Sequence, residues 1–141
     1  MIKNQRSLLI CLMIVGGVGM MFGLSEAQTT SRMSVDLKGD DPNGASFRAA
    51  INAGGRFVAF VSDVSNLIEN DTNALIDVFV HDRQTGQTSR VSVATGGIQS
   101  NGDSVSPSLS ADGRYVAFVS YASNLVSGDT NGDADVFVHD R

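Results

Sequence analysis

The stretch LSADGRYVAFVSYASNLVSGDTNGDADVFVHDR, residues 109–141, decides the fold, because the chain contains an earlier version of it. Residues 51–83 read INAGGRFVAFVSDVSNLIENDTNALIDVFVHDR, which aligns without a gap, with Ile51 on Leu109 and Arg83 on Arg141. Aligning residues 30–83 on residues 88–141 gives 30 identities in 54 positions. The chain is therefore a tandem-repeat protein, in which each repeat is one structural unit that stacks on its neighbour.

Each repeat is predicted to form short β-strands joined as a meander. The runs at 114–120 and 135–140 are rich in β-branched and aromatic residues and apolar at consecutive positions, which predicts strands covered on both faces. Short glycine-containing loops at 53–55 and 111–113 predict hairpins, and Gly86 is the residue expected to take a positive φ in the turn 83–87. The expected strands are 31–36, 48–52, 56–62, 77–82, 89–94, 106–110, 114–120 and 135–140.

This inventory predicts an all-β fold built from β-propeller blades, which are four-stranded antiparallel meanders. It comprises a lone strand at 31–36, a full blade at about 47–94 and an incomplete blade at about 105–141, within a repeat region 28–141. Two blades' worth of strands cannot close a ring, which takes roughly four to eight. Two explanations stay open: further blades missing beyond residue 141, which is the favoured one, or self-association of several copies.

The second repeat resembles a known family. Ser110-Ala-Asp-Gly-Arg-Tyr-Val-Ala-Phe118, preceded by Pro107 and followed by Asp135-Val-Phe-Val138, is similar to the WD-like repeat of TolB-like β-propellers. The resemblance covers about residues 30–141, although the first repeat has Ala49 and Gly54 where the pattern has Pro and Asp. It implies a secreted or periplasmic propeller module of a class used mainly for binding and as a scaffold.

Residues 1–27 are typical of a secretory signal peptide. Lys3 and Arg6 precede an uncharged apolar run at 7–24, and Ser25-Glu26-Ala27 places small residues before a cleavage point at Gln28. A transmembrane anchor is the alternative, but four glycines in the run and the cleavage-type exit favour removal, after which no membrane span is expected.

Cleavage would leave an acidic chain without cysteine. Taking Lys3, Arg6 and Glu26 from the 10 basic and 15 acidic residues leaves 8 and 14, a net charge of −6, and Cys11 is lost as well. This balance argues against a nucleic-acid partner, because phosphate binding needs a basic surface. Without disulfides, the stability must come from burial, strand pairing or bound ions.

The acidic loop at 121–134 carries the one candidate site. Oxygen-bearing side chains alternate at Asp129, Asn131, Asp133 and Asp135, a spacing similar to the first half of an EF-hand-type loop and suited to Ca²⁺. Ala134 stands where the loop's sharp-turn glycine belongs, and the first repeat has Leu75 in place of Asp133. An Asx-turn, in which these side chains bond their own backbone, is the favoured alternative.

Other recurring polar residues are expected to be structural. His81 and His139, at strand ends in Val-His-Asp-Arg, are expected to bond the adjacent turn rather than a metal ion, and Arg83 and Arg141 should fix the same hairpin through an ion pair or a carbonyl contact. The Ser-Asn-Leu triplets at 65–67 and 123–125 predict a turn with a buried leucine.

The sequence contains no catalytic motif such as Gly-x-Ser-x-Gly. We therefore expect an exported, non-catalytic binding or scaffolding module whose partner is a protein or surface ligand. The alternatives are the propeller portion of a larger exported hydrolase-type enzyme and a calcium-dependent surface or adhesion repeat protein.

Overall fold

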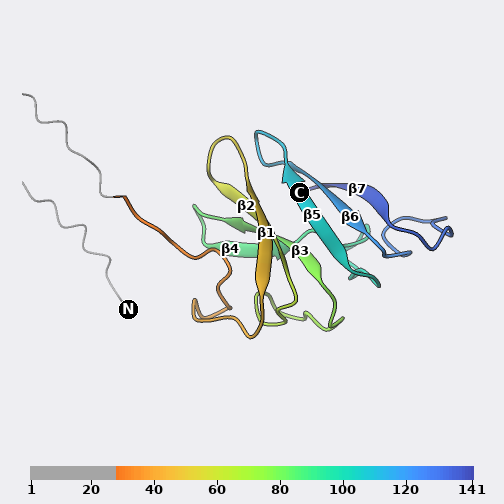
Figure 1. Ribbon diagram of the computed structural model, residues 1–141, viewed down its shortest axis with the longest axis horizontal. Helices are drawn as coiled ribbons and strands as arrows, with labels where there is room; N and C mark the ends of the chain where they lie inside the picture. The colour runs from red at the N-terminus through yellow and green to blue at the C-terminus, as the bar shows by residue number, and fades with distance from the viewer. Residues whose placement is uncertain (1–27) are drawn as a thin grey trace, which may run out of the picture. The chain divides into compact units, whose positions relative to one another are not determined.

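Seven β-strands form two antiparallel sheets in the computed structural model, which describes residues 28–141 (Figure 1). The predicted signal peptide lies outside the described residues. The first sheet has the order β1-β2-β3-β4 and the second the order β5-β6-β7. Their bounds are Ser46–Ile51 (β1), Phe57–Ser62 (β2), Asp77–Asp82 (β3), Gln87–Arg90 (β4), Ser104–Leu109 (β5), Tyr115–Ser120 (β6) and Asp135–Asp140 (β7). The all-β prediction is confirmed.

No helix among the described residues is long and apolar enough to cross a membrane.

The strands β5, β6 and β7 repeat β1, β2 and β3 in the same register. Phe60 of β2 lies opposite Phe79 of β3, and Phe118 of β6 lies opposite Phe137 of β7. The ring centroids of both pairs are 5.9 Å apart and stacked. Such cross-strand aromatic pairs contribute to sheet stability on each face. The repeat in the sequence is therefore also a repeat in the structure.

The first strand of each sheet contains a β-bulge. The register shifts between Phe47 and Ala50 in β1, and between Val105 and Ser108 in β5. Arg48 and Ser106, at equivalent positions inside the two bulges, have positive φ values of 54° and 57°. The bulge lets each strand begin earlier than the sequence predicted, because pairing continues on both sides of it.

Two segments differ from the predicted strands. Residues 31–36 form no strand in the structure, although their counterpart was expected to be the fourth strand of a blade. The fourth strand itself, β4, begins and ends earlier than the expected 89–94. After Arg90 the chain leaves the sheet, and Val91 N–H still donates to Val78 O at 2.9 Å. A strand needs a neighbouring edge, and segment 31–36 has none of the partners that β4 finds in β3.

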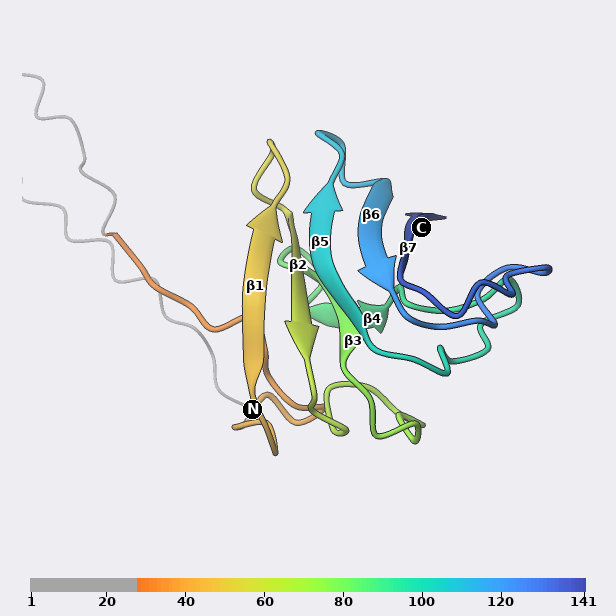
Figure 2. The same cartoon turned by 45° about the vertical axis from the view of Figure 1, so that its right-hand side comes forward.

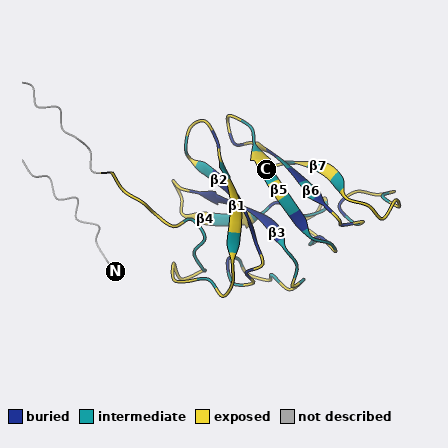
Figure 3. Ribbon diagram, in the orientation of Figure 1, coloured by how far each residue is buried: buried dark blue, intermediate teal, exposed yellow. Residues whose placement is uncertain are grey.

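The main core lies between the two sheets. Ala59, Val61, Val78 and Val80, on one face of the first sheet, are at most 1% exposed. They pack with residues of the second sheet and its loop: Val116, Phe118, Ala122 and Leu125. Figure 3 shows this buried layer where β2 and β3 face the second sheet. Removing such aliphatic surface from water supplies roughly 1.5–3 kcal/mol per fully buried side chain.

Polar contacts fix the register of the sheets. Asn52 Nδ2 donates to Ala111 O at 3.0 Å, and Ser104 N–H donates to Ile76 O at 2.7 Å. Gly113, with φ of 77°, lies so close to the ring of Phe57 that a Cβ there would sit 2.2 Å from Phe57 Cδ2. Figure 2 shows β1 and β5 as neighbours that run in the same direction, one from each sheet. The sheets are thus stacked in parallel orientation, as repeats of one unit.

The predicted turns are confirmed. Gly86 has φ of 75°, and its N–H donates to Asp82 O at 2.8 Å. In the Ser-Asn-Leu loops, Asn66 Oδ1 accepts from Asn43 N–H and Asn124 Oδ1 accepts from Asn101 N–H, both at 3.1 Å. Leu67 and Leu125, the predicted anchors, are buried.

Candidate functional site

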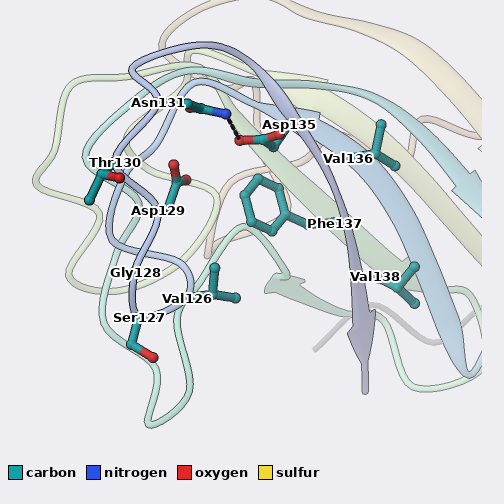
Figure 4. Close-up of a pocket in the computed structure, with 10 residues that line it drawn as sticks. All are labelled: Val126, Ser127, Gly128, Asp129, Thr130, Asn131, Asp135, Val136, Phe137 and Val138. Carbon is teal, nitrogen blue, oxygen red and sulfur yellow. Dashed lines mark hydrogen bonds between the residues drawn. The ribbon is translucent and has the colours of Figure 1, made fainter.

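The acidic loop between β6 and β7 lines an open hollow at one end of the second sheet (Figure 4). Asn131 Nδ2 donates to Asp135 Oδ2 at 3.0 Å, and Asp133 N–H donates to Asn131 Oδ1 at 2.9 Å. The second bond is an Asx-turn, in which a side-chain oxygen takes up a backbone donor two residues on. Asp129 also lines the hollow, and Asp133 is not among its lining residues.

These side chains do not form a ready metal centre. Within residues 28–141, no three Asp, Glu, His or Cys side chains lie close enough together to hold a metal ion. Asn131 already uses its oxygen in the Asx-turn and its amide on Asp135. A Ca²⁺ ion takes six to eight oxygen ligands, so the loop would have to rearrange to bind one. The calcium hypothesis stays a prediction, and the hydrogen bonds favour the turn.

The first repeat shows what the same residues do when their surroundings are complete. Asp71 and Asp77, the counterparts of Asp129 and Asp135, both accept from Arg90. Arg90 Nη1 lies 2.9 Å from Asp71 Oδ1 and 2.8 Å from Asp77 Oδ2. The three side chains are no more than 6% exposed. Two carboxylates at this spacing form a binding site for one guanidinium group.

Hydroxyl and amide groups complete the buried cluster around Asp77. Its Oδ1 accepts from Ser92 Oγ at 2.5 Å and from Ser100 Oγ at 2.9 Å. Its Oδ2 accepts from Asn73 Nδ2 at 2.9 Å in addition to Arg90. A fully buried carboxylate needs these hydrogen bonds and the ion pair, because burying an unpaired carboxylate would lower the stability of the fold by several kcal/mol. Arg90 Nε is the one buried side-chain nitrogen or oxygen in the described residues without a hydrogen-bond partner.

Burial affects the titration of Asp71. Desolvation raises the pKa of the Asp71 carboxyl, and the attraction of Arg90 opposes that rise. The guanidinium therefore favours the charged carboxylate that burial disfavours. The two carboxylates are placed to hold a cation, and the cation that they hold is the guanidinium group of Arg90.

Sequence reasoning missed this cluster. Its members Asp77, Arg90, Ser92 and Ser100 are spread over separate segments, and only the fold brings them together. A signal was present, because Arg32-x-Ser34 recurs as Arg90-x-Ser92 and the pair Asp71 and Asp77 recurs as Asp129 and Asp135. Three of the four predicted residues, Asp129, Asn131 and Asp135, are thus the counterparts of Asp71, Asn73 and Asp77 in the cluster around Arg90, whereas Asp133 corresponds to Leu75 and has no counterpart there.

His81 bonds the neighbouring strand and not the adjacent turn that the sequence predicted. His81 Nδ1 lies 3.0 Å from Thr88 Oγ1 on the neighbouring strand. Burial is the main cause that lowers the pKa of His81 and also that of His139. Neutral imidazoles of this kind hydrogen-bond their neighbours without carrying charge.

The Asp-Arg pairs that follow the histidines fix the hairpins. Arg56 makes two bonds to Asp82, from Nε at 2.9 Å and from Nη2 at 2.7 Å, and this ion pair lowers the pKa of Asp82. Arg114 binds Asp140 in the same way, at 2.6 and 2.7 Å. Arg83 donates to Gly55 O and Arg141 donates to Gly113 O, as the sequence predicted.

Comparison with known proteins gives no family: no protein-family model matches the chain, and no curated protein shows significant similarity to it.

Proposed function

We propose that the chain is an exported, non-catalytic β-propeller repeat module that serves in binding or as a scaffold, in a secreted or periplasmic setting. The observation that carries this proposal is that the acidic and imidazole side chains of β3, in the first repeat, hydrogen-bond to other residues of the chain. Asp77, His81 and Asp82 of the first repeat are all engaged in hydrogen bonds that hold the sheet and its loops together. Side chains so engaged position backbone and neighbours rather than a substrate.

The repeat architecture supports the same proposal. Two equivalent meanders stack so that one face of the first sheet meets the opposite face of the second. Repetition of one unit builds an extended surface of similar loops, which is how repeat proteins present binding sites. The loops between β2 and β3 and between β6 and β7 are the longest in the two sheets and lie at equivalent positions.

The proposal makes two separable claims, export and binding. For export, the full chain with a C-terminal tag is expressed in a Gram-negative host, and the product is fractionated and sequenced from its N-terminus. We expect a periplasmic or secreted product that begins at Gln28. A cytoplasmic product with an intact N-terminus would contradict export.

For binding, residues 28–141 are tested on arrays of surface polysaccharides and exported proteins, and against chromogenic ester, peptide and glycoside substrates. We expect saturable binding of one ligand class and no turnover. Turnover that disappears in a folded His81→Asn/His139→Asn variant would instead assign an enzyme.

A further inference from the structure

The outer face of the second sheet exposes residues that the first repeat buries. Val136 and Val138 are 75% and 66% exposed, whereas their equivalents Val78 and Val80 are 0% and 1% exposed. Figure 4 shows Val136 and Val138 on the opposite side of β7 from Phe137, which faces the core. Exposed apolar faces of this kind mark interaction surfaces. What covers Val78 and Val80 is the second sheet itself.

The first sheet exposes the kind of surface that the second sheet uses to pack against the first. A hollow of about 270 Å³ lies between Met33 and the residues Phe47, Val58 and Phe60. Their equivalents in the second repeat are Val91, Val105, Val116 and Phe118, which all belong to the core between the sheets. The described residues therefore carry both halves of the interface that the two sheets form with each other.

The segment before β1 already has the fold of the linker before β5. Gly39 N–H donates to Asp36 O and Gly97 N–H donates to Ala94 O, both at 2.9 Å. Asp36 N–H donates to Asp40 O at 3.1 Å, and Ala94 N–H donates to Ile98 O at 2.9 Å. The segment that carries Arg32 and Ser34 is thus anchored like the segment that carries Arg90 and Ser92.

We propose that the second sheet binds a second copy of this chain, head to tail. Residues 29–32 of the partner copy, Thr-Thr-Ser-Arg, pair with the edge of β7 that no strand among residues 28–141 covers, as Gln-Thr-Ser-Arg of β4 pairs with β3. The guanidinium group of the partner's Arg32 then binds the carboxylates of Asp129 and Asp135. The hydroxyl of the partner's Ser34 donates a hydrogen bond to Asp135. Val136 and Val138 fill the partner's hollow beside Phe60.

Charge and strand pairing both favour this occupant over an unrelated protein. The half-buried carboxylates Asp129 and Asp135 stand where Asp71 and Asp77 bind the guanidinium of Arg90 in the first repeat. Arg32 now pairs with Asp41 at the surface, where both side chains are more than half exposed. Such a pair is weak, so its exchange for a partly buried one costs little. Thr30 of the partner would also face His139, as Thr88 faces His81.

A head-to-tail contact of this kind is heterologous and repeats from copy to copy. It closes into a ring if the rotation permits, and rings of about four to eight blades correspond to two to four copies. The inference goes beyond the proposed function, because a chain that stayed monomeric could still bind another ligand. A monomeric chain would therefore contradict the proposed assembly but not the proposed binding function.

The test uses two variants of residues 28–141, each of which disables one half of the contact. Arg32→Glu reverses the charge on the N-terminal segment, and Val136→Asp places a charge on the open face. Both residues are exposed, so both variants should keep their fold, which circular dichroism checks. Lys38→Glu and Tyr121→Asp are the matched controls, because Tyr121 is exposed and the first repeat has Asp63 at its equivalent position.

Light scattering after size exclusion, over a range of about 100-fold in concentration, gives the mass of each species. We expect the unaltered chain and both controls to form a discrete oligomer or a filament, and each variant alone to be monomeric. An equal mixture of the two variants should form a dimer, because the intact face of one meets the intact N-terminal segment of the other. A monomeric unaltered chain, association that survives in both variants, or a mixture that stays monomeric would each overturn the proposal.

Discussion

Arg90 Nη1 lies 2.8 Å from Asp77 Oδ2, and the side chain of Asp77 is entirely buried. This contact ties the start of β3 to the end of β4, and Ser100 extends it to the segment that leads into β5. The second sheet contains the same aspartate at position 135, where Asn131 is the side chain bound to it among the described residues. Equivalent sequences thus have different environments because their neighbours differ.

Asp77→Ala should lower the free energy of unfolding by about 3–5 kcal/mol, because it removes one of the two carboxylates that pair with buried Arg90 and the acceptor of Ser92 and Ser100. Urea unfolding followed by circular dichroism measures the loss. Asp140→Asn is the control, since its ion pair with Arg114 is about half exposed on both sides and should be worth about 0–1 kcal/mol. Equal losses in the two variants would contradict the assigned role of the cluster.

Gly113→Ala should destabilise the chain more than Gly55→Ala. Both glycines have positive φ, 77° and 67°, so each substitution costs about 1–2 kcal/mol of backbone strain. Only at Gly113 would the new Cβ meet Phe57, whereas the nearest atom at Gly55 is 3.6 Å away. Overpacking adds about 1–3 kcal/mol, which thermal unfolding resolves. If Gly55→Ala proved the more harmful, the contact between the sheets would be placed wrongly.

Stability should fall as the pH drops through the histidine range. The pKa values of His81 and His139 lie below 6.5 in the folded chain, mainly because burial disfavours the charged ring. The unfolded chain then takes up protons first, so the free energy of unfolding decreases from about pH 6.5 down to the folded-state pKa values. The lowered pKa values of Asp82 and Asp140 act only near and below pH 3.8.

A His81→Asn/His139→Asn variant separates these contributions. Its slope of unfolding free energy against pH, measured by urea titration between about pH 5 and 7, should be flatter than that of the unaltered chain. An unchanged slope would show that other groups cause the pH dependence.

Asn131→Ala should cost about 0.5–1.5 kcal/mol, because Asp133 N–H and Asp135 lose a hydrogen bond each. Asp133→Ala should change the stability little, since it keeps its backbone donor. Calorimetric titration with Ca²⁺ should give no saturable heat in either variant or in the unaltered chain. Saturable heat that Asp133→Ala abolishes would establish the calcium site in place of the Asx-turn.

The sequence predicted the regular part of the fold well. The runs Val58–Ser62 and Val78–Asp82 are strongly β-forming, and their near-copies forced the same prediction in the second repeat. Repetition also predicted the turn at Gly86 and the anchors Leu67 and Leu125. At these positions the local sequence pattern and the repeat predict the same structure, and the contacts in the folded chain are consistent with it.

The remaining features depend on contacts that a linear pattern does not contain. Residues 31–36 share Ser-Arg with β4 but pair with no strand among the described residues, so the same amino acids form no strand there. The Asp77 cluster joins Asp77 of β3 to Arg90, Ser92 and Ser100, which lie 13 to 23 positions further on, in β4 and in the linker before β5. In both cases the structure depends on neighbouring residues that are distant in the sequence.

The stacking of the two repeats is the claim on which the fold, the cluster and the proposed assembly all depend, and nuclear Overhauser spectroscopy tests it most directly. Gly113 packs against the Phe57 ring, and the Arg141 guanidinium lies 4.2 Å from the centroid of the same ring. We predict cross-peaks between the Phe57 ring protons and the Gly113 α-protons, with ring-current shifts at Gly113 that disappear in Phe57→Leu. Absent cross-peaks, together with Gly113 shifts that Phe57→Leu leaves unchanged, would contradict the account.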